Sequence, residues 1–294
     1  MKTSGFLSVR EKYLKYLKKQ EILGQPFQDK NGQLKNYYIP ICNLIYKNYL
    51  KKNKAIIIGL SGGQGSGKTT ITEILKIILK TKYNLNTVSF SIDDFYKTLS
   101  ERKKLSKKSH ELFLTRGVPG THDIKLLLRT FKNLQKKSFR KFLIPKFDKS
   151  KDDRMIKRKW KVVKRKPSVV IFEGWCVGAV HQNKYELKKP INLLEKKQDK
   201  SMKWRKYVNF QLTGKYKTFH NMLDCLLYLK ARNFSLLRRW RLKQEKKLFL
   251  KSKNKKNLKI MKKNQVLNFM MTYQRITEQM FKTATKFSSI VMKL

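Results

Sequence analysis

The sequence predicts an α/β fold, in which parallel strands alternate with helices. Four short apolar runs, at residues 55–60, 87–92, 168–172 and 225–229, are each separated from the next by polar or helical sequence. Strands that alternate with helices in this way form parallel βαβ units. The first run has a β-branched middle and ends at a glycine-rich turn, which is typical of a strand that is buried on both faces.

Helical patterns lie before and after the first strand. Leu7, Tyr13, Leu14 and Leu17 fall near one face of a helix, and residues 39–50 repeat the pattern after a turn-forming stretch. We therefore expect a helical N-terminal extension at residues 1–50 and a main domain at 51–294. Residues 71–79 predict the helix that follows the glycine-rich turn. The lysine-dense tract 243–263 has few apolar residues and predicts a mobile loop between two helices.

The composition is strongly basic. The chain has 294 residues with 71 Lys and Arg against 19 Asp and Glu, a formal net charge of +52, and 57 of the basic residues are lysines. A polyanion partner or a coding bias toward lysine explains such an excess. Because the lysines are spread over the whole chain, coding bias is favoured, and we expect no obligatory nucleic-acid or membrane partner. The hydrophobic fraction of 40% excludes collagen and a disordered tail.

The cysteines and the short apolar runs indicate in which cellular compartment the protein resides. Cys42, Cys176 and Cys225 are odd in number and lack CxxC spacing, so they are interpreted as free thiols in a reducing environment. No apolar run reaches the roughly 18 residues that a bilayer span requires. We expect a cytoplasmic protein, and the sequence gives no indication of its oligomeric state.

The glycine-rich turn satisfies the phosphate-loop pattern GxxxxGK[ST], and it lies between a predicted strand and a predicted helix. Its glycines allow successive backbone N–H groups to face phosphate oxygens at the positive end of the helix. Lys68 adds charge for the β and γ phosphates, and Thr69 offers a hydroxyl to Mg²⁺. The alternative is a glycine-rich turn without a ligand. The predicted nucleotide-binding residues are Gly62, Gly63, Gln64, Gly65, Ser66, Gly67, Lys68, Thr69 and Thr70.

Acidic residues are scarce, and three of them end predicted strands. Asp93 and Asp94 follow the run at 87–92, where a carboxylate accepts the proton of a hydroxyl that attacks the γ-phosphoryl group. For Asp94 a capping role on the next helix is about equally favoured. Glu173 ends the run at 168–172 and is interpreted as a group that holds the Mg²⁺ shell, the alternative being a surface acid at a strand end.

A cationic set lies between these acids. Arg116 and His122 belong to the stretch RGVPGTHD, and Lys146 belongs to IPKFDKS. Thr121 or Asp123 in this region is also suited to capping a helix, and the Pro-Gly pair to making a turn. Together the side chains of Arg116, His122 and Lys146 are suited to binding a small carboxylate, with Arg in bidentate fashion.

The motifs occur in a specific order along residues 50–294. After GLS and the phosphate loop come SIDDFY (91–96), RGVPGTHD (116–123), PKFDKS (145–150), FEGW (172–175), WRKYVN (204–209), WRLKQE (240–245) and YQRIT (273–277). In this order they resemble the plant-type D-glycerate kinase family, P-loop kinases related to uridine kinase, phosphoribulokinase and pantothenate kinase.

The resemblance implies a P-loop kinase fold, a sheet of parallel strands with helices on both faces and a helical lid at about 231–263. It also implies ATP and Mg²⁺ as cosubstrates and D-glycerate as the phosphoryl acceptor. It implies that Asp93 is the general base, that Glu173 is the acidic Walker B residue, and that Arg238 or Arg241 clamps phosphates when the lid closes. The implied acceptor-binding residues are Asp94, Tyr96, Arg116, His122, Lys146, Asp148 and Arg154.

Two alternative functions remain. A kinase of the uridine kinase type needs aromatic rings that stack on a base, and Phe95, Tyr96 and Phe147 are suited to this. A basic nucleotide-binding protein with an RNA partner is the other alternative, and it has no need for Asp93 and Glu173.

Overall fold

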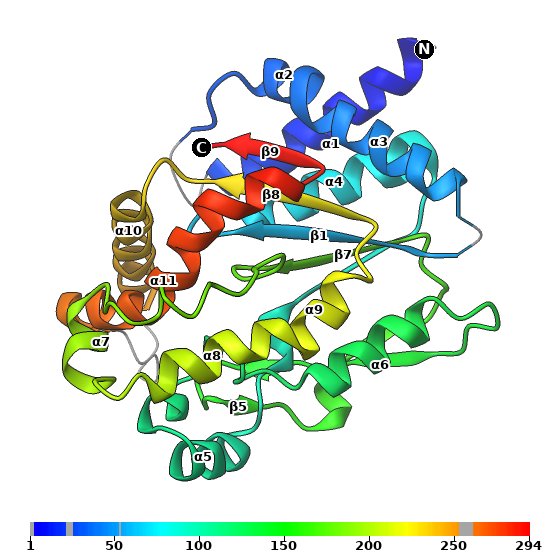
Figure 1. Ribbon diagram of the computed structural model, residues 1–294. Coiled ribbons are helices and arrows are strands. Elements are labelled where there is room, and N and C mark those ends of the chain that lie inside the picture. The colour runs from blue at the N-terminus through cyan, green and yellow to red at the C-terminus, as the bar shows by residue number, and fades with distance from the viewer. Residues whose placement is uncertain (1–2, 22–25, 53, 253–260) are drawn as a thin grey trace.

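The protein, described here from a computed structural model of residues 3–21, 26–52, 54–252 and 261–294, is built around one parallel sheet (Figure 1). Five strands lie in the order β2-β7-β1-β8-β9, and every neighbouring pair is parallel. The strands are β1 (Ile56–Gly62), β2 (Thr87–Ser91), β7 (Val169–Gly174), β8 (Cys225–Lys230) and β9 (Ile290–Lys293). The four predicted strands and the α/β class are confirmed, and β9 is an additional edge strand.

The N-terminal helices and α4 cover one face of the sheet (Figure 1). These elements are α1 (Thr3–Glu21), α2 (Lys30–Gln33), the π-helical turn η1 (Leu34–Tyr38), α3 (Ile39–Leu50) and α4 (Lys68–Tyr83). Tyr13 and Leu17 of α1 share a core with Ile56, Ile58 and Leu60 of β1. The predicted helical extension is therefore present, and it is packed into the core of the main domain.

A second core lies on the opposite face. Ile57 of β1 points there, because successive side chains of a strand alternate between its faces. Phe90, Phe131 and Phe172 form its centre, with ring centroids 5.1 to 5.9 Å apart. The helices that contribute to this core are α6 (Ile124–Leu134), α8 (Lys203–Thr213), α9 (Lys215–His220) and α11 (Lys263–Phe287). Helices therefore cover both faces, as predicted.

Shorter elements connect the strands. They include the 3-10 turns η2 (Ile92–Phe95), η3 (Glu111–Leu114) and η4 (Lys157–Lys159), and the helices α5 (Leu99–Lys108) and α7 (Leu193–Gln198). Two antiparallel pairs join β3 (Phe142–Ile144) to β6 (Lys161–Val163), and β4 (Phe147–Asp148) to β5 (Asp153–Arg154). The β4–β5 turn carries the PKFDKS motif into the neighbourhood of η2, which follows β2.

Helix α10 (Phe234–Ser252) corrects the prediction of a mobile loop at 243–263. Residues 243–252 continue the helix, while 253–260 lie outside the described residues and α11 begins at Lys263. The sequence signal is weak because residues 243–252 are rich in lysine. Phe234 and Leu237 pack with Val266 and Met270 of α11 in a small separate cluster. The proposed lid is thus largely helical.

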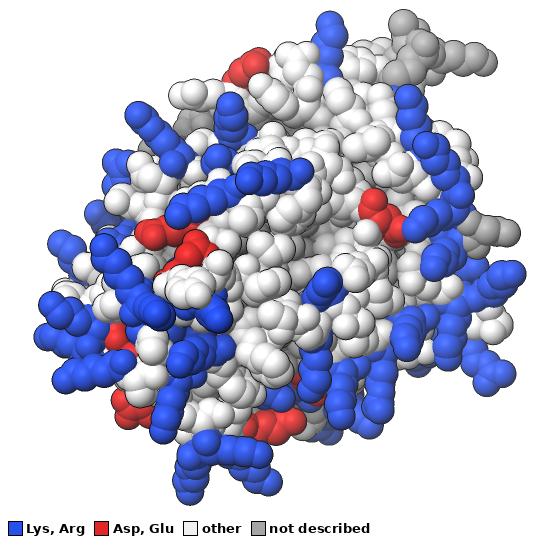
Figure 2. All heavy atoms as spheres, in the orientation of Figure 1, with Lys and Arg blue, Asp and Glu red and all other residues white. Residues whose placement is uncertain are grey.

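Basic side chains are distributed widely over the surface. Figure 2 shows Lys and Arg side chains spread widely over the visible face, with few acidic side chains among them. Within the described part of the chain, we find no helix that combines the length and the apolar character needed to cross a membrane.

Candidate active site

The phosphate loop joins the end of β1 to the start of α4. Gly65 and Gly67 adopt φ values of +81° and +84°, which favour glycine. At Gly65 a Cβ atom would also lie only 2.7 Å from the Cβ of Trp240 in α10. The hydroxyl oxygen of Ser66 is buried and has no hydrogen-bond partner within the described chain. An orphaned hydroxyl in a loop of this shape fits a bound polyphosphate.

Lys68 begins α4 and points into the loop. Its Nζ donates hydrogen bonds to the carbonyl oxygens of Gly62 at 2.8 Å and Gly63 at 2.9 Å. Burial lowers the pKa of Lys68, and the nearby carboxylates of Glu173 and Asp93 oppose that shift. Among the described residues no carboxylate lies at hydrogen-bond distance from the Lys68 ammonium, and a triphosphate would supply such an anionic partner.

Glu173 lies at the end of β7, facing α4. Thr69 Oγ1 donates to Glu173 Oε1 at 3.2 Å, and Thr72 Oγ1 donates to Oε2 at 3.3 Å. Burial raises the pKa of Glu173, partly offset by Lys68 and by both threonines. The hydroxyl of Thr69 and this carboxylate are hard oxygen donors beside the phosphate loop, so the residues present fit Mg²⁺, which binds few protein ligands together with substrate phosphates.

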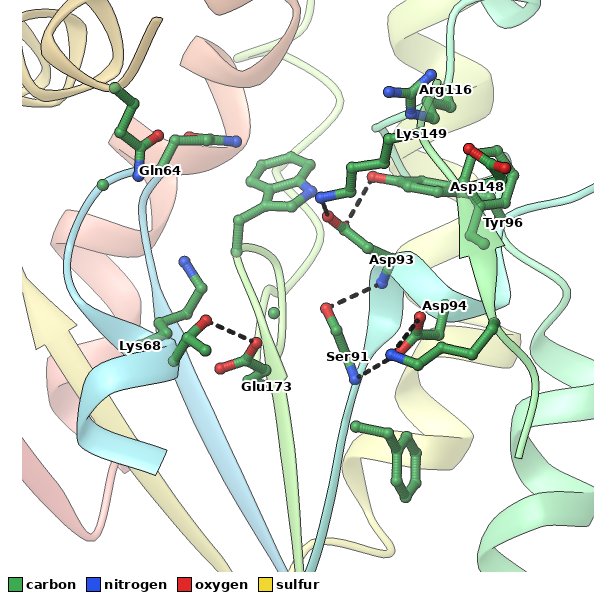
Figure 3. Close-up of a pocket in the computed structure, with 18 of the residues that line it drawn as sticks. Gln64, Lys68, Ser91, Asp93, Asp94, Tyr96, Arg116, Asp148, Lys149 and Glu173 are labelled. Carbon is green, nitrogen blue, oxygen red and sulfur yellow. Dashed lines mark hydrogen bonds and ion pairs between the residues drawn. The ribbon is translucent and has the colours of Figure 1, made fainter. Parts of the chain in front are cut away.

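Asp93 stands on η2, just past the end of β2, and both of its carboxylate oxygens are engaged. Tyr96 Oη donates to Oδ1 at 2.9 Å, and Lys149 Nζ donates to Oδ2 at 2.8 Å (Figure 3). Burial by itself favours the neutral acid, but Lys149 and the Tyr96 hydroxyl outweigh it, so the pKa of Asp93 is lowered. Asp93 is therefore ionised at neutral pH.

Asp94 makes the capping contact that the sequence left open. Its Oδ2 accepts from the backbone N–H of Ser91 at 3.3 Å, while the Ser91 hydroxyl accepts from Asp93 N–H at 3.2 Å. Lys146 Nζ lies 3.4 Å from Asp94 Oδ1. Asp94 is buried, and it fixes the η2 turn that carries Asp93 as well as holding Lys146.

Arg116 lies on the opposite side of the site from the phosphate loop. Its guanidinium pairs with Asp152 and lies over the ring of Phe147, 5.4 Å from the centroid. Its side chain is one quarter exposed, so an anionic ligand can reach it.

His122 and Arg154 are not brought to the cavity wall. His122 is buried behind Tyr96, with ring centroids 4.5 Å apart, and its Nδ1 lies 2.5 Å from the hydroxyl of Tyr216. Burial lowers the pKa of His122 to about 3, so the ring is neutral at pH 7. Arg154 donates to the Tyr96 carbonyl at 2.9 Å and pairs with Asp123. Both side chains therefore contact Tyr96 from behind in this structure, and their direct contact with the acceptor stays a prediction.

The predicted lid arginines differ in position. Arg241 lines the cavity and pairs with Glu245, whereas Arg238 does not line it and donates to Gln274 Oε1 at 3.2 Å. In this conformation only Arg241 faces the place where a phosphate clamp is needed.

These side chains surround one open cleft of about 1290 Å³ (Figure 3). The sequence-predicted residues that line it are Gln64, Gly65, Lys68, Thr69, Asp93, Asp94, Tyr96, Arg116, Lys146, Asp148, Glu173 and Arg241. Sequence reasoning assigned no role to Lys149, Trp175 and Tyr273, which also line it. All three belong to recognised motifs, so motif membership was the available signal.

A parallel sheet with a phosphate loop after β1 and acids at the ends of β2 and β7 defines a P-loop kinase. The sequence profile of the Phosphoribulokinase / Uridine kinase family matches residues 57–207, and the chain belongs to that family. It is an ATP-dependent phosphotransferase.

Individual relatives agree with the assignment to a kinase family. An uncharacterized kinase of Schizosaccharomyces pombe, mug58, is 33% identical over 219 residues, which are 70% of this chain and 75% of that protein. A chloroplastic D-glycerate 3-kinase of Arabidopsis thaliana is 31% identical over 232 residues, which are 73% of this chain and 48% of the plant protein. The structure of a D-glycerate 3-kinase from Cryptococcus neoformans superposes with a TM-score of 0.71 at 23% identity, covering 87% of this chain and 95% of that one. The plant relative confirms the resemblance to glycerate kinases, and the Cryptococcus structure confirms the fold.

Proposed function

We propose that the protein transfers the γ-phosphoryl group of ATP to a hydroxyl of D-glycerate. One observation carries the proposal: Lys68 and Asp93 line the same cleft as the cations Arg116, Lys146 and Lys149. A substrate for such a cleft is an alcohol that also bears a carboxylate. The similarity to the plant D-glycerate 3-kinase favours glycerate among such hydroxy acids.

The nucleotide half of the cleft holds the triphosphate. Backbone N–H groups of residues 62–70 and the Lys68 ammonium neutralise the phosphates, and Arg241 adds charge at the transferring group. Thr69 and Glu173 would hold Mg²⁺, which supplies further neutralisation of the β and γ phosphates when bound. Residues 231–263, with Arg238 on α10, are proposed as the lid that excludes water from this half.

Asp93 handles the acceptor proton. As the acceptor oxygen bonds to the γ-phosphorus, its proton passes to a carboxylate oxygen of Asp93. The bond between that phosphorus and the β–γ bridging oxygen breaks, and the bridging oxygen leaves on ADP. The hydroxyl of Tyr96 at 2.9 Å orients the carboxylate for this transfer.

The cationic wall orients the acceptor. Arg116 and Lys146 bind its carboxylate, so that the hydroxyl is presented to Asp93. Asp148 lines the cleft beside them and accepts hydrogen bonds from its own turn. His122 and Arg154 contribute indirectly, through Tyr96. We place this activity in the cytoplasm, in keeping with the three cysteines, which are free and buried.

A nucleoside acceptor is the second candidate, because rings of Tyr96, Phe147 and Trp175 line the cleft. Phe95, which was expected to take part, is completely buried in the core instead. The wall of cations favours an acid over a neutral nucleoside. Membership of a kinase family leaves a non-catalytic RNA-binding role without support.

A coupled ADP-release assay tests the proposal with D-glycerate, glycerol and uridine as acceptors. We expect much faster ADP release with D-glycerate than with glycerol or uridine, phosphoglycerate as the product, and strongly reduced release from the Asp93→Asn variant. Turnover of uridine with none of D-glycerate would contradict the glycerate assignment while leaving the kinase assignment intact.

A further inference from the structure

The turn between β4 and β5 places the ammonium of Lys149 against the carboxylate of Asp93, the proposed catalytic base. Lys149 Nζ lies 2.8 Å from Asp93 Oδ2, and Tyr96 Oη occupies Oδ1 at 2.9 Å (Figure 3). Both oxygens of Asp93 are therefore acceptors of hydrogen bonds before any substrate arrives. Each of these donors stabilises the negative charge of the carboxylate and so makes it a weaker proton acceptor, and the charge of the Lys149 ammonium has the larger effect.

The turn that presents Lys149 is well braced. Asp148 Oδ1 accepts from the backbone N–H groups of Ser150 at 2.9 Å and Lys151 at 3.2 Å. Asp152 adopts a φ of +56°, and its carboxylate holds both Arg102 and Arg116. The backbone of the turn is thus fixed in place, while the Lys149 side chain, 63% exposed, remains able to swing.

Lys149 differs from the other cations of the acceptor wall in its partner. Arg116 pairs with Asp152, and Lys146 pairs with Asp94. Each of these pairs leaves Asp93 untouched, whereas the ion pair of Lys149 is with Asp93 itself. A ligand that attracts Lys149 therefore changes the state of the base.

We propose that Lys149 makes the base sensitive to the acceptor's carboxylate: the lysine leaves Asp93 Oδ2 to bind that carboxylate, which frees Oδ2 to take the hydroxyl proton. This inference rests on the proposed function. A carboxylate competes with Asp93 for the ammonium because both are anions. A neutral alcohol of the same shape offers no such competitor, so Lys149 stays on Asp93 Oδ2 and the base stays weak. The acceptor's carboxylate is then needed for chemistry as well as for binding.

Other groups face Asp93, and they bear on any titration of it. They are Lys68 of α4, Tyr96 after η2, His122 before α6, Glu173 of β7, Cys176 after β7, and Tyr273 of α11. Of these and Lys149, only Lys149 is a cation that donates a hydrogen bond to Asp93. Its removal therefore raises the pKa of Asp93, because the burial that favours the neutral acid is then less opposed.

The test compares Lys149→Met with Lys151→Met, which makes the same change on the same turn at an exposed side chain outside the cleft. Steady-state kinetics with D-glycerate and glycerol are measured across pH. In Lys149→Met we expect the preference in kcat/KM for D-glycerate over glycerol to fall about tenfold or more, since a charge-assisted hydrogen bond is lost. The acid limb of kcat/KM should move about one pH unit higher. Lys151→Met should match the wild type in both.

Lys149→Arg keeps the charge and should return the acid limb toward its wild-type position. Equal losses of kcat/KM for the two acceptors in Lys149→Met, with an unmoved acid limb, would overturn the inference alone, provided that the wild type phosphorylates D-glycerate. Absence of wild-type turnover with D-glycerate would instead refute the proposed function and this inference with it.

Discussion

The side chain of Arg102 is completely buried, and its guanidinium lies 3.0 Å from the carboxylate of Asp152. Arg102 also donates to the carbonyl oxygen of Leu114 at 2.5 Å and to that of Lys97 at 3.3 Å. The other oxygen of Asp152 holds Arg116 at the cleft. A buried cation of α5 is thus connected through one acid to a cation that faces the acceptor.

Asp152→Ala should therefore affect both stability and acceptor binding. The buried Arg102 loses its acid, so we expect a loss of about 1–3 kcal/mol in the free energy of unfolding. Arg116 loses its anchor, so KM for D-glycerate should rise about tenfold while kcat changes less. Urea denaturation and steady-state kinetics measure the two effects. Glu111→Ala, an exposed acid on η3, is the control, and equal denaturation midpoints for both variants would contradict the prediction.

Much of the fold was predictable because buried parallel strands are continuous apolar runs. β1 is buried along its whole length, and β7 along all but Glu173. β9 escaped prediction because it is a four-residue edge strand that is only partly buried. The α10 segment at 243–252 escaped because it is rich in lysine, and the described apolar side chains of α10 that pack with α11, such as Phe234 and Leu237, lie before it.

The site was predictable where backbone geometry demands particular residues, and less so elsewhere. The phosphate loop specifies its own conformation, and strand ends place Asp93 and Glu173 at one edge of the sheet. His122 and Arg154 have the right chemistry for an acceptor site, but Tyr216 and Asp123 engage them behind Tyr96. One sequence does not distinguish a polar side chain that faces a cleft from one that is buried beside it.

Buried His122 should make the protein less stable in mild acid. Its folded pKa of about 3 lies below the ordinary value of 6.5, so the unfolded chain binds more protons between those pH values. The contribution of His122 to the free energy of unfolding is fully present well above pH 6.5. It is lost as the pH falls, by about 2 kcal/mol at pH 5. In His122→Gln the free energy of unfolding should therefore fall by about 2 kcal/mol less between pH 7 and pH 5 than in the wild type, as measured by urea denaturation at both pH values. The exposed His181→Gln should leave this fall unchanged, and equal slopes for the two variants would refute the prediction.

Gly117 lies in the RGVPGTHD motif, and its conformation brings Tyr273 to the cleft. Its φ is +145°, and a Cβ atom there would lie 2.2 Å from the hydroxyl oxygen of Tyr273. Gly117→Ala should lower the free energy of unfolding by about 1–3 kcal/mol and reduce kcat/KM, since backbone strain and a clash coincide. Gly214→Ala is the matched control, because a Cβ atom there meets nothing within 4 Å. Equal melting temperatures of the two variants would contradict the close contact between Gly117 and Tyr273.

Glu173→Gln should weaken the binding of Mg²⁺ rather than the binding of the acceptor. The amide keeps the contact with Thr69 but removes the negative charge from the proposed metal shell. The Mg²⁺ concentration for half-maximal activity should rise about tenfold or more, with little change in KM for D-glycerate. Glu73→Gln, an acid of α4 that pairs with Lys76 at 2.7 Å, should leave that concentration unchanged. Chelation of Mg²⁺ should abolish turnover in every variant, and an equal response of both variants to Mg²⁺ would exclude Glu173 from the metal shell.

Lys68→Met and Asp93→Asn separate charge neutralisation from proton transfer. Lys68→Met should lower kcat about 10²–10³-fold, because a preorganised cation is lost from the phosphates. Asp93→Asn should lower kcat about 10²–10⁴-fold and should also remove the acid limb of the pH profile, since its amide takes no proton. Both side chains lie at the cleft and outside the apolar cores, so both variants should retain the wild-type circular dichroism spectrum. Lys80→Met, on the exposed end of α4, should keep full activity. An Asp93→Asn enzyme that retains the acid limb at near wild-type kcat would assign the proton to another group in the cleft.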